Sequence, residues 1–448
     1  MSLLIVKFTN NSGLPDTDVS IGFVPGASGD AFTITNSKDG SALEPLNISK
    51  SYPFPGNWYR LDMLSSGVEI TSFSGRIYVA YNTPWTVQYG GYEPAQTISD
   101  PNFFLRYDKM EITFTGSQYD VANLTSIDYW SIPITLDTFP KTTGLVQTVY
   151  GLLNPATAQD VFNGLNALTT PPTSGINNAL PALVPGTFPN APTSASFARI
   201  IGPSSYPPIN PPPGGVPITP YNTLQDYLKN LLALFGPGSE VGAHVPTLGN
   251  GVIATIAGNF AGVGPTPPPS GPLSPQAYSL SASINSALDI TLTGTLTEAS
   301  SSTPIPTTMI YYAPDLLNPT GIYGGNTPYF LNGSVSGTNS GNDVYGWIGG
   351  DLFSGLNIGA VGSTTIDSGK MVGAMESHLW FKIPTSSFFA KMQPNGTNYN
   401  QWAATLAPLS QAYNFAYSDR FAPVFVSLNP AQVDTLVVTL ESGMVTMT

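Results

Sequence analysis

Two carboxylates of this chain, Glu111 and Asp128, are 17 residues apart in segments typical of β-strands. Between Met110 and Thr115, large apolar residues alternate with polar ones, which predicts a strand with Glu111 and Thr113 on one face. Two carboxylates on one open face can perform acid–base chemistry, and glycoside hydrolysis requires such a pair. One carboxylic acid protonates the departing oxygen, while the other acts as a nucleophile or activates water.

The two segments are expected to pair as a hairpin, because residues 116–120 offer turn chemistry between them. A hairpin symmetric about residues 119–120 would place Glu111 directly opposite Asp128. In that register Trp130 also lies on the carboxylate face, where a flat ring could cover a glucose unit. A bulge of one residue would turn Trp130 inward instead.

A purely structural interpretation of the same residues stays open at this point. Glu111 could be tied to Lys109 or Arg106, and Asp128 could be an ordinary solvated residue. Uncompensated acids on adjacent strands destabilise a sheet, so the pairing would need one of these explanations.

The segment from residue 107 to residue 134 resembles the catalytic stretch of glycoside hydrolase family 64. These are thaumatin-like β-1,3-glucanases that release laminaripentaose from long glucans. Other segments resemble landmarks of the family and occur in the family's order, namely residues 74–79, 144–149, 199–203, 371–379 and 412–419. No single segment is specific, but their shared order is.

The resemblance implies roles for individual residues. Glu111 would be the general acid and Asp128 the general base of an inverting, endo-type cleavage of β-1,3-glucan, such as laminarin or curdlan, into short oligosaccharides. Thr113 and Thr125 match threonines that line the family's sugar groove. The further substrate-binding positions expected are Thr115, Tyr119, Trp130 and Asp419.

Some of these positions depart from the family pattern. Thr115 stands where the family often has asparagine, and Ser418 and Asp419 stand where paired aspartates tend to occur. The tryptophan expected between the two acids is missing, and Tyr119 is the nearest aromatic residue. The departures concern sugar contacts, so the alternative function is a non-catalytic thaumatin-like protein that binds β-glucan.

The expected fold is mainly β with an α/β portion. A thaumatin-like β-sandwich or barrel domain would join a mixed α/β domain, and the two would enclose a wide groove. We expect the barrel with its catalytic hairpin in residues 1–140, the mixed domain with proline-rich insertions in residues 141–370, and a C-terminal segment in residues 371–448. That last segment should carry short helices and return to the barrel.

Local patterns predict individual elements within these regions. Short strands are expected at residues 3–8, 20–24, 31–35, 75–81 and 435–440, and a hairpin at 280–297. Helices are expected from an Asn154 cap to residue 168 and from 223 to 235, the second with a core-facing apolar stripe. Proline clusters at 207–213 and 265–275 predict stiff connectors, and the glycine-rich stretch at 349–362 predicts turns.

Composition narrows the function classes. Only 9% of residues are charged and the net charge is −13, which disfavours a nucleic-acid partner but not a neutral polysaccharide. The absence of cysteine excludes disulfides and thiolate chemistry, and two distant histidines disfavour a zinc site or a serine–histidine–aspartate hydrolase. No cofactor and no metal are expected.

Compartment and assembly are expected from weaker signals. The first ten residues lack a basic region and a long apolar core, so they predict a first strand and no visible signal peptide. The family resemblance nevertheless implies a secreted, extracellular protein. No apolar run is long enough to predict a membrane span, and a monomer is expected.

Overall fold

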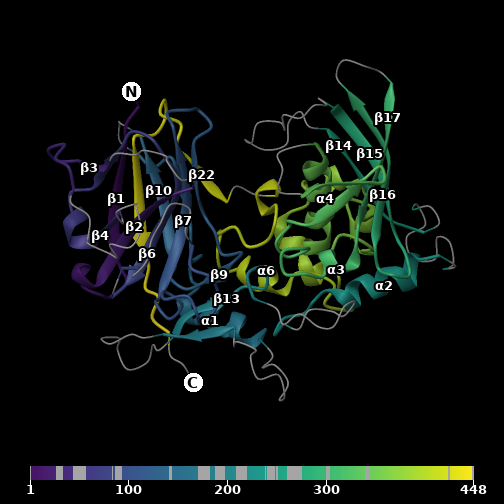
Figure 1. Cartoon of the computed structure of the whole chain (residues 1–448), viewed down its shortest axis with the longest axis horizontal. Coiled ribbons are helices and arrows are strands. Elements are labelled where there is room, and N and C mark those ends of the chain that lie inside the picture. Colours follow the sequence, from purple (N-terminus) through teal and green to yellow (C-terminus); the bar gives the residue numbers. More distant parts are fainter. Residues whose placement is uncertain are drawn as a thin grey trace.

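A computed structural model provides the structure of the chain. It describes residues 2–26, 34–43, 57–82, 84–85, 93–140, 144–169, 182–186, 197–207, 219–237, 239, 248, 251–259, 275–298, 303–338, 344–421 and 424–445. These residues form two lobes that lie side by side (Figure 1). The predicted proline-rich connectors lie almost entirely outside the described residues.

A sandwich of two six-stranded sheets forms the first lobe, which is purple, blue and yellow in Figure 1. The order of the first sheet is β11 (Gln147–Val149), β10 (Ile134–Phe139), β23 (Thr435–Leu440), β1 (Leu4–Asn10), β5 (Val68–Ile70) and β3 (Ile34–Asn36). The order of the second is β22 (Phe425–Ser427), β8 (Val121–Leu124), β7 (Tyr107–Phe114), β6 (Phe73–Tyr81), β2 (Val19–Pro25) and β4 (Trp58–Arg60).

Apolar residues at alternate positions of both sheets fill the core of the sandwich. Val6, Ile77 and Leu436 are fully buried there, and each such side chain contributes about 1.5–3 kcal/mol by leaving water. Strand β23 runs parallel to β1, with Val6 beside Leu436. The C-terminal strand therefore returns to the N-terminal sandwich.

A six-stranded antiparallel sheet organises the second lobe, which is teal and green in Figure 1. Its order is β14 (Val252–Asn259), β15 (Pro275–Ile284), β16 (Ile290–Glu298), β17 (Pro304–Tyr311), β18 (Pro328–Leu331) and β19 (Ser334–Thr338). Strands β15 and β16 are the predicted hairpin. Helices α2 (Gln225–Phe235) and α4 (Val344–Ile358) share a core with this sheet. Smaller elements are α3 (Ala313–Leu316), α5 (Ser377–Trp380) and the hairpin β20 (Ile366–Asp367) to β21 (Lys370–Met371).

Most of the glycine-rich stretch belongs to helix α4, so the prediction of turns was wrong for Gly349, Gly350 and Gly355. It was right at the end of the stretch, where Gly359 and Gly362 lie in turns with positive φ. Helix α4 is buried along almost its whole length, and large side chains occupy the space above its glycines. A Cβ added to Gly355 would lie 2.3 Å from a ring carbon of Trp380, and one added to Gly350 would lie 2.5 Å from the Arg420 guanidinium. Close packing by neighbours offsets the low helix propensity of glycine.

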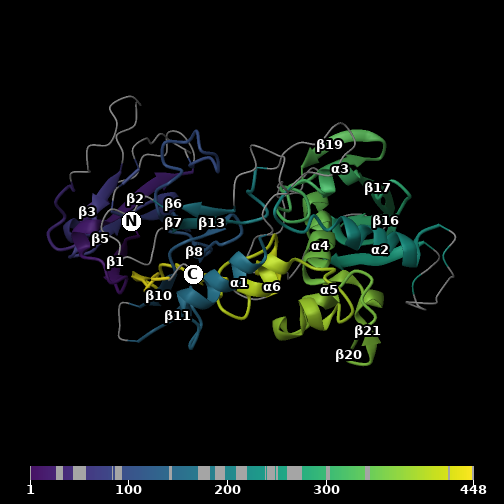
Figure 2. The same cartoon turned by 90° about the horizontal axis from the view of Figure 1, so that it is seen from below.

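A small three-stranded sheet and two helices lie where the lobes meet (Figures 1 and 2). The sheet has the order β12 (Leu183–Pro185), β13 (Phe197–Ile201) and β9 (Tyr129–Trp130). Helix α1 (Ala158–Ala167) contacts α6 (Gln401–Leu406). Thr157 caps α1 through a capping box with Asp160, so the predicted Asn154 cap was wrong.

The architecture confirms the expected fold class of a mainly β chain with an α/β portion. The apolar stripe of α2 is also confirmed, because Tyr227, Leu228 and Leu231 are buried against the six-stranded sheet of the second lobe. The predicted strand at residues 31–35 falls partly outside the described residues, and β3 begins at Ile34.

Candidate active site

The hairpin of β7 and β8 turns earlier than the sequence predicts. The Asp120 carboxylate accepts hydrogen bonds from the backbone N–H groups of Thr115, Gly116 and Ser117, at 2.7, 2.7 and 2.9 Å. These bonds close a tight turn, and Glu111 consequently pairs with Asn123. The predicted register, with Glu111 directly opposite Asp128, was wrong.

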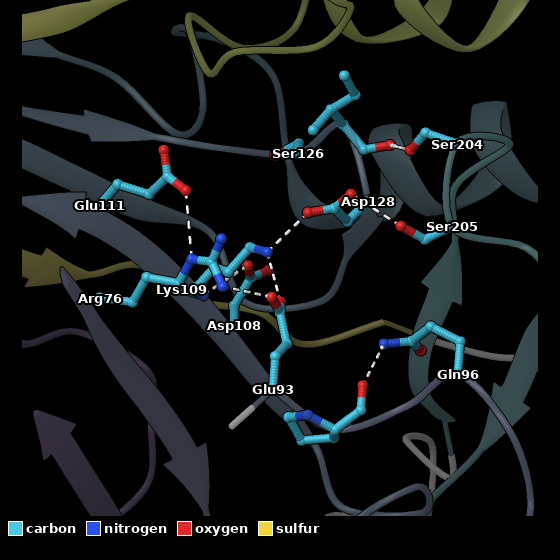
Figure 3. Close-up of polar contacts among 12 residues, drawn as sticks. Arg76, Glu93, Gln96, Asp108, Lys109, Glu111, Ser126, Asp128, Ser204 and Ser205 are labelled. Atoms are coloured by element: carbon cyan, nitrogen blue, oxygen red, sulfur yellow. Dashed lines mark hydrogen bonds and ion pairs between the residues drawn. The ribbon is translucent and has the colours of Figure 1, made fainter. Parts of the chain in front are cut away.

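Asp128 reaches the same region by a different route. After β8 ends at Leu124, Thr125 forms a parallel bridge with Tyr413, and the Ser126 N–H donates to the Tyr413 carbonyl at 2.8 Å. The chain then pairs with β13 instead of β7. This change of partner allows the Asp128 side chain to point back toward β7, where it meets Lys109 (Figure 3).

Two donors hold the Asp128 carboxylate. The Lys109 ammonium donates to Oδ2 at 2.7 Å, and the Ser205 hydroxyl donates to Oδ1 at 2.8 Å. Burial by itself would raise the pKa of Asp128, but the nearby Lys109 charge and these hydrogen bonds outweigh burial and hold that pKa below its ordinary value. Asp128 is therefore ionised at neutral pH, as a general base must be.

Lys109 is a buried cation shared by two carboxylates. Its side chain is 1% exposed, and its ammonium group pairs with both Asp128 and Glu93. The ammonium also lies 5.2 Å from the centre of the Tyr129 ring, within the range of a cation–π contact. Burial favours the neutral amine, but Asp128 and then Glu93 outweigh it, so the pKa of Lys109 lies well above its ordinary value.

Glu111 has a more open environment than Asp128. Its side chain is 42% exposed, and Oε1 accepts from Nε of Arg76 at 3.2 Å. The Asn123 amide donates to the other oxygen at 3.4 Å. Arg76 is placed there by strand pairing, because it lies directly opposite Glu111 on β6. In Figure 3 the cations of Arg76 and Lys109 lie between the Glu111 and Asp128 carboxylates.

Both carboxylates line one cavity of about 900 Å³ between the lobes. The sandwich contributes Arg76, Asn123 and Phe425, and the second lobe contributes residues 320, 324 and 326. Two smaller cavities adjoin the main cavity. One, of about 290 Å³, shares Glu111 with it, and the other, of about 380 Å³, shares Asp128 with it. We call these three connected cavities the groove.

The groove contains most of the sugar-contact positions predicted from the sequence. Thr125, Tyr119 and Asp419 line the main cavity. Thr113 lines the adjoining cavity on the sandwich, where its hydroxyl lies 3.2 Å from that of Ser74. Tyr119 is 58% exposed at the tip of the hairpin, so its ring is free to contact a sugar.

Two predicted positions do not line the groove. Trp130 is 2% exposed and packs in the core around helix α1, because β9 pairs with β13 and not with β7. The predicted place of Trp130 on the carboxylate face was wrong. The Thr115 hydroxyl donates to Asp120 at 3.0 Å within the hairpin turn, and Thr115 does not line any of the three cavities.

Asp419 lies in a short helical turn on the far side of the groove. Burial raises the pKa of Asp419, and the adjacent Arg420 partly opposes this rise. Arg420 is fixed in turn by an ion pair with Asp351 of helix α4, which also accepts hydrogen bonds from Tyr278 and Ser377. The second lobe therefore positions a third carboxyl group on the main cavity that Glu111 and Asp128 line.

Sequence reasoning did not assign roles to Arg76, Glu93, Ser204 or Ser205. Pairing of residues 73–81 with 107–114 would have identified Arg76, since it places this cation opposite Glu111. The spacing of Lys109 and Glu111 puts both on one face of β7. Glu93, Ser204 and Ser205 lie in loops, where strand periodicity carries no information.

The hydrogen bond from Ser205 predicts a measurable effect on Asp128. In Ser205→Ala the pKa of Asp128 should rise by about half a pH unit, because one donor to the ionised form is lost. Titration of the Asp128 carboxyl carbon by NMR measures this change. Ser204→Ala is the matched control, since Ser204 donates to the Ile127 carbonyl at 2.5 Å and not to the carboxylate. Equal shifts in both variants would contradict a specific role for Ser205.

Two further observations concern the described residues only. Among them, no group of three or more histidine, aspartate or glutamate side chains is arranged to hold a metal ion. No helix in this part of the chain is both long and apolar enough to span a membrane.

Comparison with known proteins confirms the resemblance seen in the sequence. The model of glycoside hydrolase family 64, described as β-1,3-glucanase, matches residues 2–177, a segment that contains Glu93, Glu111 and Asp128. No curated protein matches the sequence of the chain.

Two solved structures share the fold over nearly the whole chain. One is a laminaripentaose-producing β-1,3-glucanase in complex with laminaritetraose, which is 15% identical, with a TM-score of 0.54 over 99% of this chain and 100% of that chain. The other is a family 64 β-1,3-glucanase domain from Clostridium beijerinckii, 13% identical, with a TM-score of 0.56 over 98% of each chain.

Proposed function

We propose that this chain, whose residues 2–177 match the β-1,3-glucanase model of glycoside hydrolase family 64, hydrolyses β-1,3-glucan in the groove between its lobes. The observation that carries the proposal is the placement of Glu111 and Asp128 on one cavity in different electrostatic environments. Two carboxyl groups with different protonation are what general acid–base cleavage of a glycosidic bond requires.

Asp128 is suited to the role of general base. Lys109 and Ser205 bind one carboxylate oxygen each and favour the ionised form. The side chain is still 31% exposed, so water can approach it. An ionised Asp128 would take a proton from that water as the water attacks the anomeric carbon from the face opposite the leaving group.

Glu111 is suited to the role of general acid. It is the other carboxyl group of the pair that lines the main cavity. In its protonated form it would donate its proton to the glycosidic oxygen as the C–O bond breaks, and the departing sugar would leave with a hydroxyl group. The Arg76 and Lys109 cations between the two carboxyl groups keep them apart, which supports an inverting reaction with room for water.

The shape of the groove supports an extended substrate. The three adjoining cavities extend beyond Glu111 in one direction and beyond Asp128 in the other. Sugar units can therefore bind on either side of the cleaved bond. We assign sugar contacts to Thr113, Thr125, Tyr119 and Asp419, which line this groove. An open groove that continues on both sides of the catalytic pair also favours endo-type cleavage.

Further features of the proposal rest on the family match. Both solved neighbours are β-1,3-glucanases, so laminarin and curdlan are the substrates we propose first. We also propose a thaumatin-like first domain, a division of the chain near residues 140 and 370, secretion of the protein, and a monomeric state.

Incubation with laminarin or curdlan tests the proposal. The wild type should release soluble oligosaccharides, detected by chromatography, and Asp128→Asn should release far fewer, because asparagine cannot accept the proton of water. If the wild type releases no oligosaccharides and yet is retained on insoluble curdlan, the result would contradict hydrolysis and favour the non-catalytic glucan-binding protein.

A further inference from the structure

A third carboxylate, Glu93, contacts both the Arg76 and the Lys109 cations (Figure 3). Its Oε2 accepts from Nη1 of Arg76 at 2.6 Å, and its Oε1 accepts a hydrogen bond from the Lys109 ammonium. Glu93 comes from the loop between β6 and β7, whereas Arg76 and Lys109 come from those strands. The loop thus adds a carboxylate that contacts both cations at once.

The ion pairs form a continuous series in which each cation pairs with two carboxylates. Arg76 joins Glu111 to Glu93, and Lys109 joins Glu93 to Asp128. Three carboxylates therefore share two positive charges. The net charge of this cluster is zero when one of its three carboxyl groups is protonated. The proposed reaction requires the general acid to be the protonated one.

The contacts at the Glu111 end of this series of ion pairs differ from those at the Asp128 end. Arg76 lies 2.6 Å from Glu93 but 3.2 Å from Glu111, and the Arg76 side chain is 37% exposed. The Arg76–Glu111 contact is consequently long and partly screened by water. Lys109 is 1% exposed and lies 2.7 Å from Asp128, so its charge acts on Asp128 with little screening. A cation therefore acts more strongly on the Asp128 carboxylate than on the Glu111 carboxyl group.

We propose that Glu93 is a positioning residue that sets opposite protonation states in the catalytic pair. It holds Arg76 away from full pairing with Glu111, so that less positive charge acts on the carboxyl group that must donate a proton. It also fixes the buried Lys109 ammonium where that group contacts Asp128. The inference rests on the proposed function, because it assigns protonation states to that acid and that base.

Several titratable groups face this cluster. Around Glu93 the strands contribute Arg76 and Tyr78 of β6, Tyr107, Lys109 and Glu111 of β7, and Tyr129 of β9. Asp128 directly precedes β9. Asp108 contacts the backbone of Lys109 from the opposite face of β7, and Asp419 lies across the groove. Burial raises the pKa of each tyrosine in this group, so they stay neutral over the working range. The two cations and three facing carboxylates therefore dominate the local charge.

Glu93→Gln tests the inference, since glutamine keeps the shape of the side chain and removes its charge. Arg76 is then free to pair with Glu111, so the pKa of Glu111 should fall. A general acid must be protonated, and the basic limb of the pH profile of kcat/KM should accordingly move to lower pH, by about one unit. At pH 7 the activity should fall by about tenfold.

Two more variants separate positioning from general loss of structure. Glu93→Asp keeps the negative charge and should retain a basic limb close to that of the wild type. Arg76→Met removes the cation that contacts Glu111, so its basic limb should move to higher pH, opposite to Glu93→Gln. Glu69→Gln is the matched control, because Glu69 lies on β5 of the other sheet and should leave the profile unchanged.

A readout that does not need activity keeps this inference distinct from the proposed function. NMR titration of side-chain carboxyl carbons, with the Glu111 signal assigned from Glu111→Gln, should give a lower Glu111 pKa in Glu93→Gln than in the wild type. A wild type without glucanase activity would refute the proposed function, and this titration would still test the role of Glu93. An unchanged Glu111 pKa, or a raised KM with both limbs in place, would overturn the inference and make Glu93 a sugar contact.

Discussion

Replacement of Glu111 by glutamine is expected to lower kcat on laminarin by about 10³-fold, within the range for loss of one general acid. The side chain of glutamine has the same shape as that of glutamate and can still contact Arg76 and Asn123, so KM should change by only a few-fold. Steady-state kinetics of Glu111→Gln beside Glu69→Gln measures both constants. The control should match the wild type, because Glu69 lies outside the groove.

A substrate with an activated leaving group distinguishes the two catalytic roles. An aryl laminarioligosaccharide with an acidic phenol departs without protonation, so Glu111→Gln should recover most of its lost activity on it. Asp128→Asn should stay inactive on the same substrate, because the attacking water still needs a base. The reverse pattern would exchange the proposed roles of Glu111 and Asp128.

Replacement of Lys109 by methionine is expected to have the second large effect, on stability and on pH dependence together. Lys109 is 1% exposed and pairs with Glu93 and Asp128, whose side chains are 25% and 31% exposed. Without the ammonium, the two partly buried carboxylates lose the cation that they share, although Arg76 still pairs with Glu93 and Ser205 still donates to Asp128. We expect the free energy of unfolding at pH 7 to fall by about 2–3 kcal/mol, somewhat less than for a fully buried pair.

The direction of the pH dependence follows from the pKa of Asp128. In the folded wild type, the pKa of Asp128 lies below its value in the unfolded chain. The ion pair therefore stabilises the fold fully at any pH above the pKa of the unfolded chain. This stabilisation is lost as the pH falls through the pKa of the folded protein. In Lys109→Met the pKa of Asp128 should rise, and the stability deficit should shrink as the pH is lowered from 7 to 5. The acidic limb of the activity profile should move up by a unit or more.

Urea unfolding of Lys109→Met and the wild type at both pH values measures this effect. Lys229→Met is the matched control, because Lys229 is 54% exposed on helix α2 and contacts only Asp226 and Gln225 in the described structure. Its stability should differ little from that of the wild type at either pH. A Lys109→Met deficit that is equal at pH 5 and pH 7 would contradict the electrostatic role of Lys109.

Strand positions were predictable because burial on one face imposes a period of two. Residues 435–440 alternate clearly, and the structure contains β23 there. Strand β6 was visible instead as a run of β-branched and aromatic residues, which is buried at every position from Ile77 to Tyr81. The register of the β7–β8 hairpin was not predictable in the same way. It depends on one side chain, Asp120, whose carboxylate binds three backbone N–H groups and fixes the position of the turn.

Residue type and family resemblance therefore pointed to Glu111 and Asp128, the acid and base proposed here, and both line one cavity. Their predicted pairing, with Glu111 directly opposite Asp128, was wrong. Asp128 approaches Lys109 because the chain leaves β7 after Leu124 to pair with Tyr413 and then with β13. Both partners lie far from Asp128 in the sequence, so local patterns do not report them. The same change of partner buries Trp130.

Helix α4 shows a second limit of local patterns. Its glycines disfavour a helix by about 1 kcal/mol each, and the sequence carries no separate signal that Trp380 and Arg420 require their small size. Tertiary packing determines the structure of this segment. The apolar stripe of α2, in contrast, was visible at helical spacing, because one face of α2 packs on the sheet and the other does not.

The anomeric configuration of the first product tests the central claim most directly. Proton NMR can follow the hydrolysis of laminarin by the wild type before mutarotation mixes the anomers. Acid–base cleavage by Glu111 and Asp128 with inversion predicts that the α-anomer of the new reducing end appears first and then equilibrates. Early appearance of the β-anomer would show retention and would contradict the assignment of Asp128 as the base that activates water.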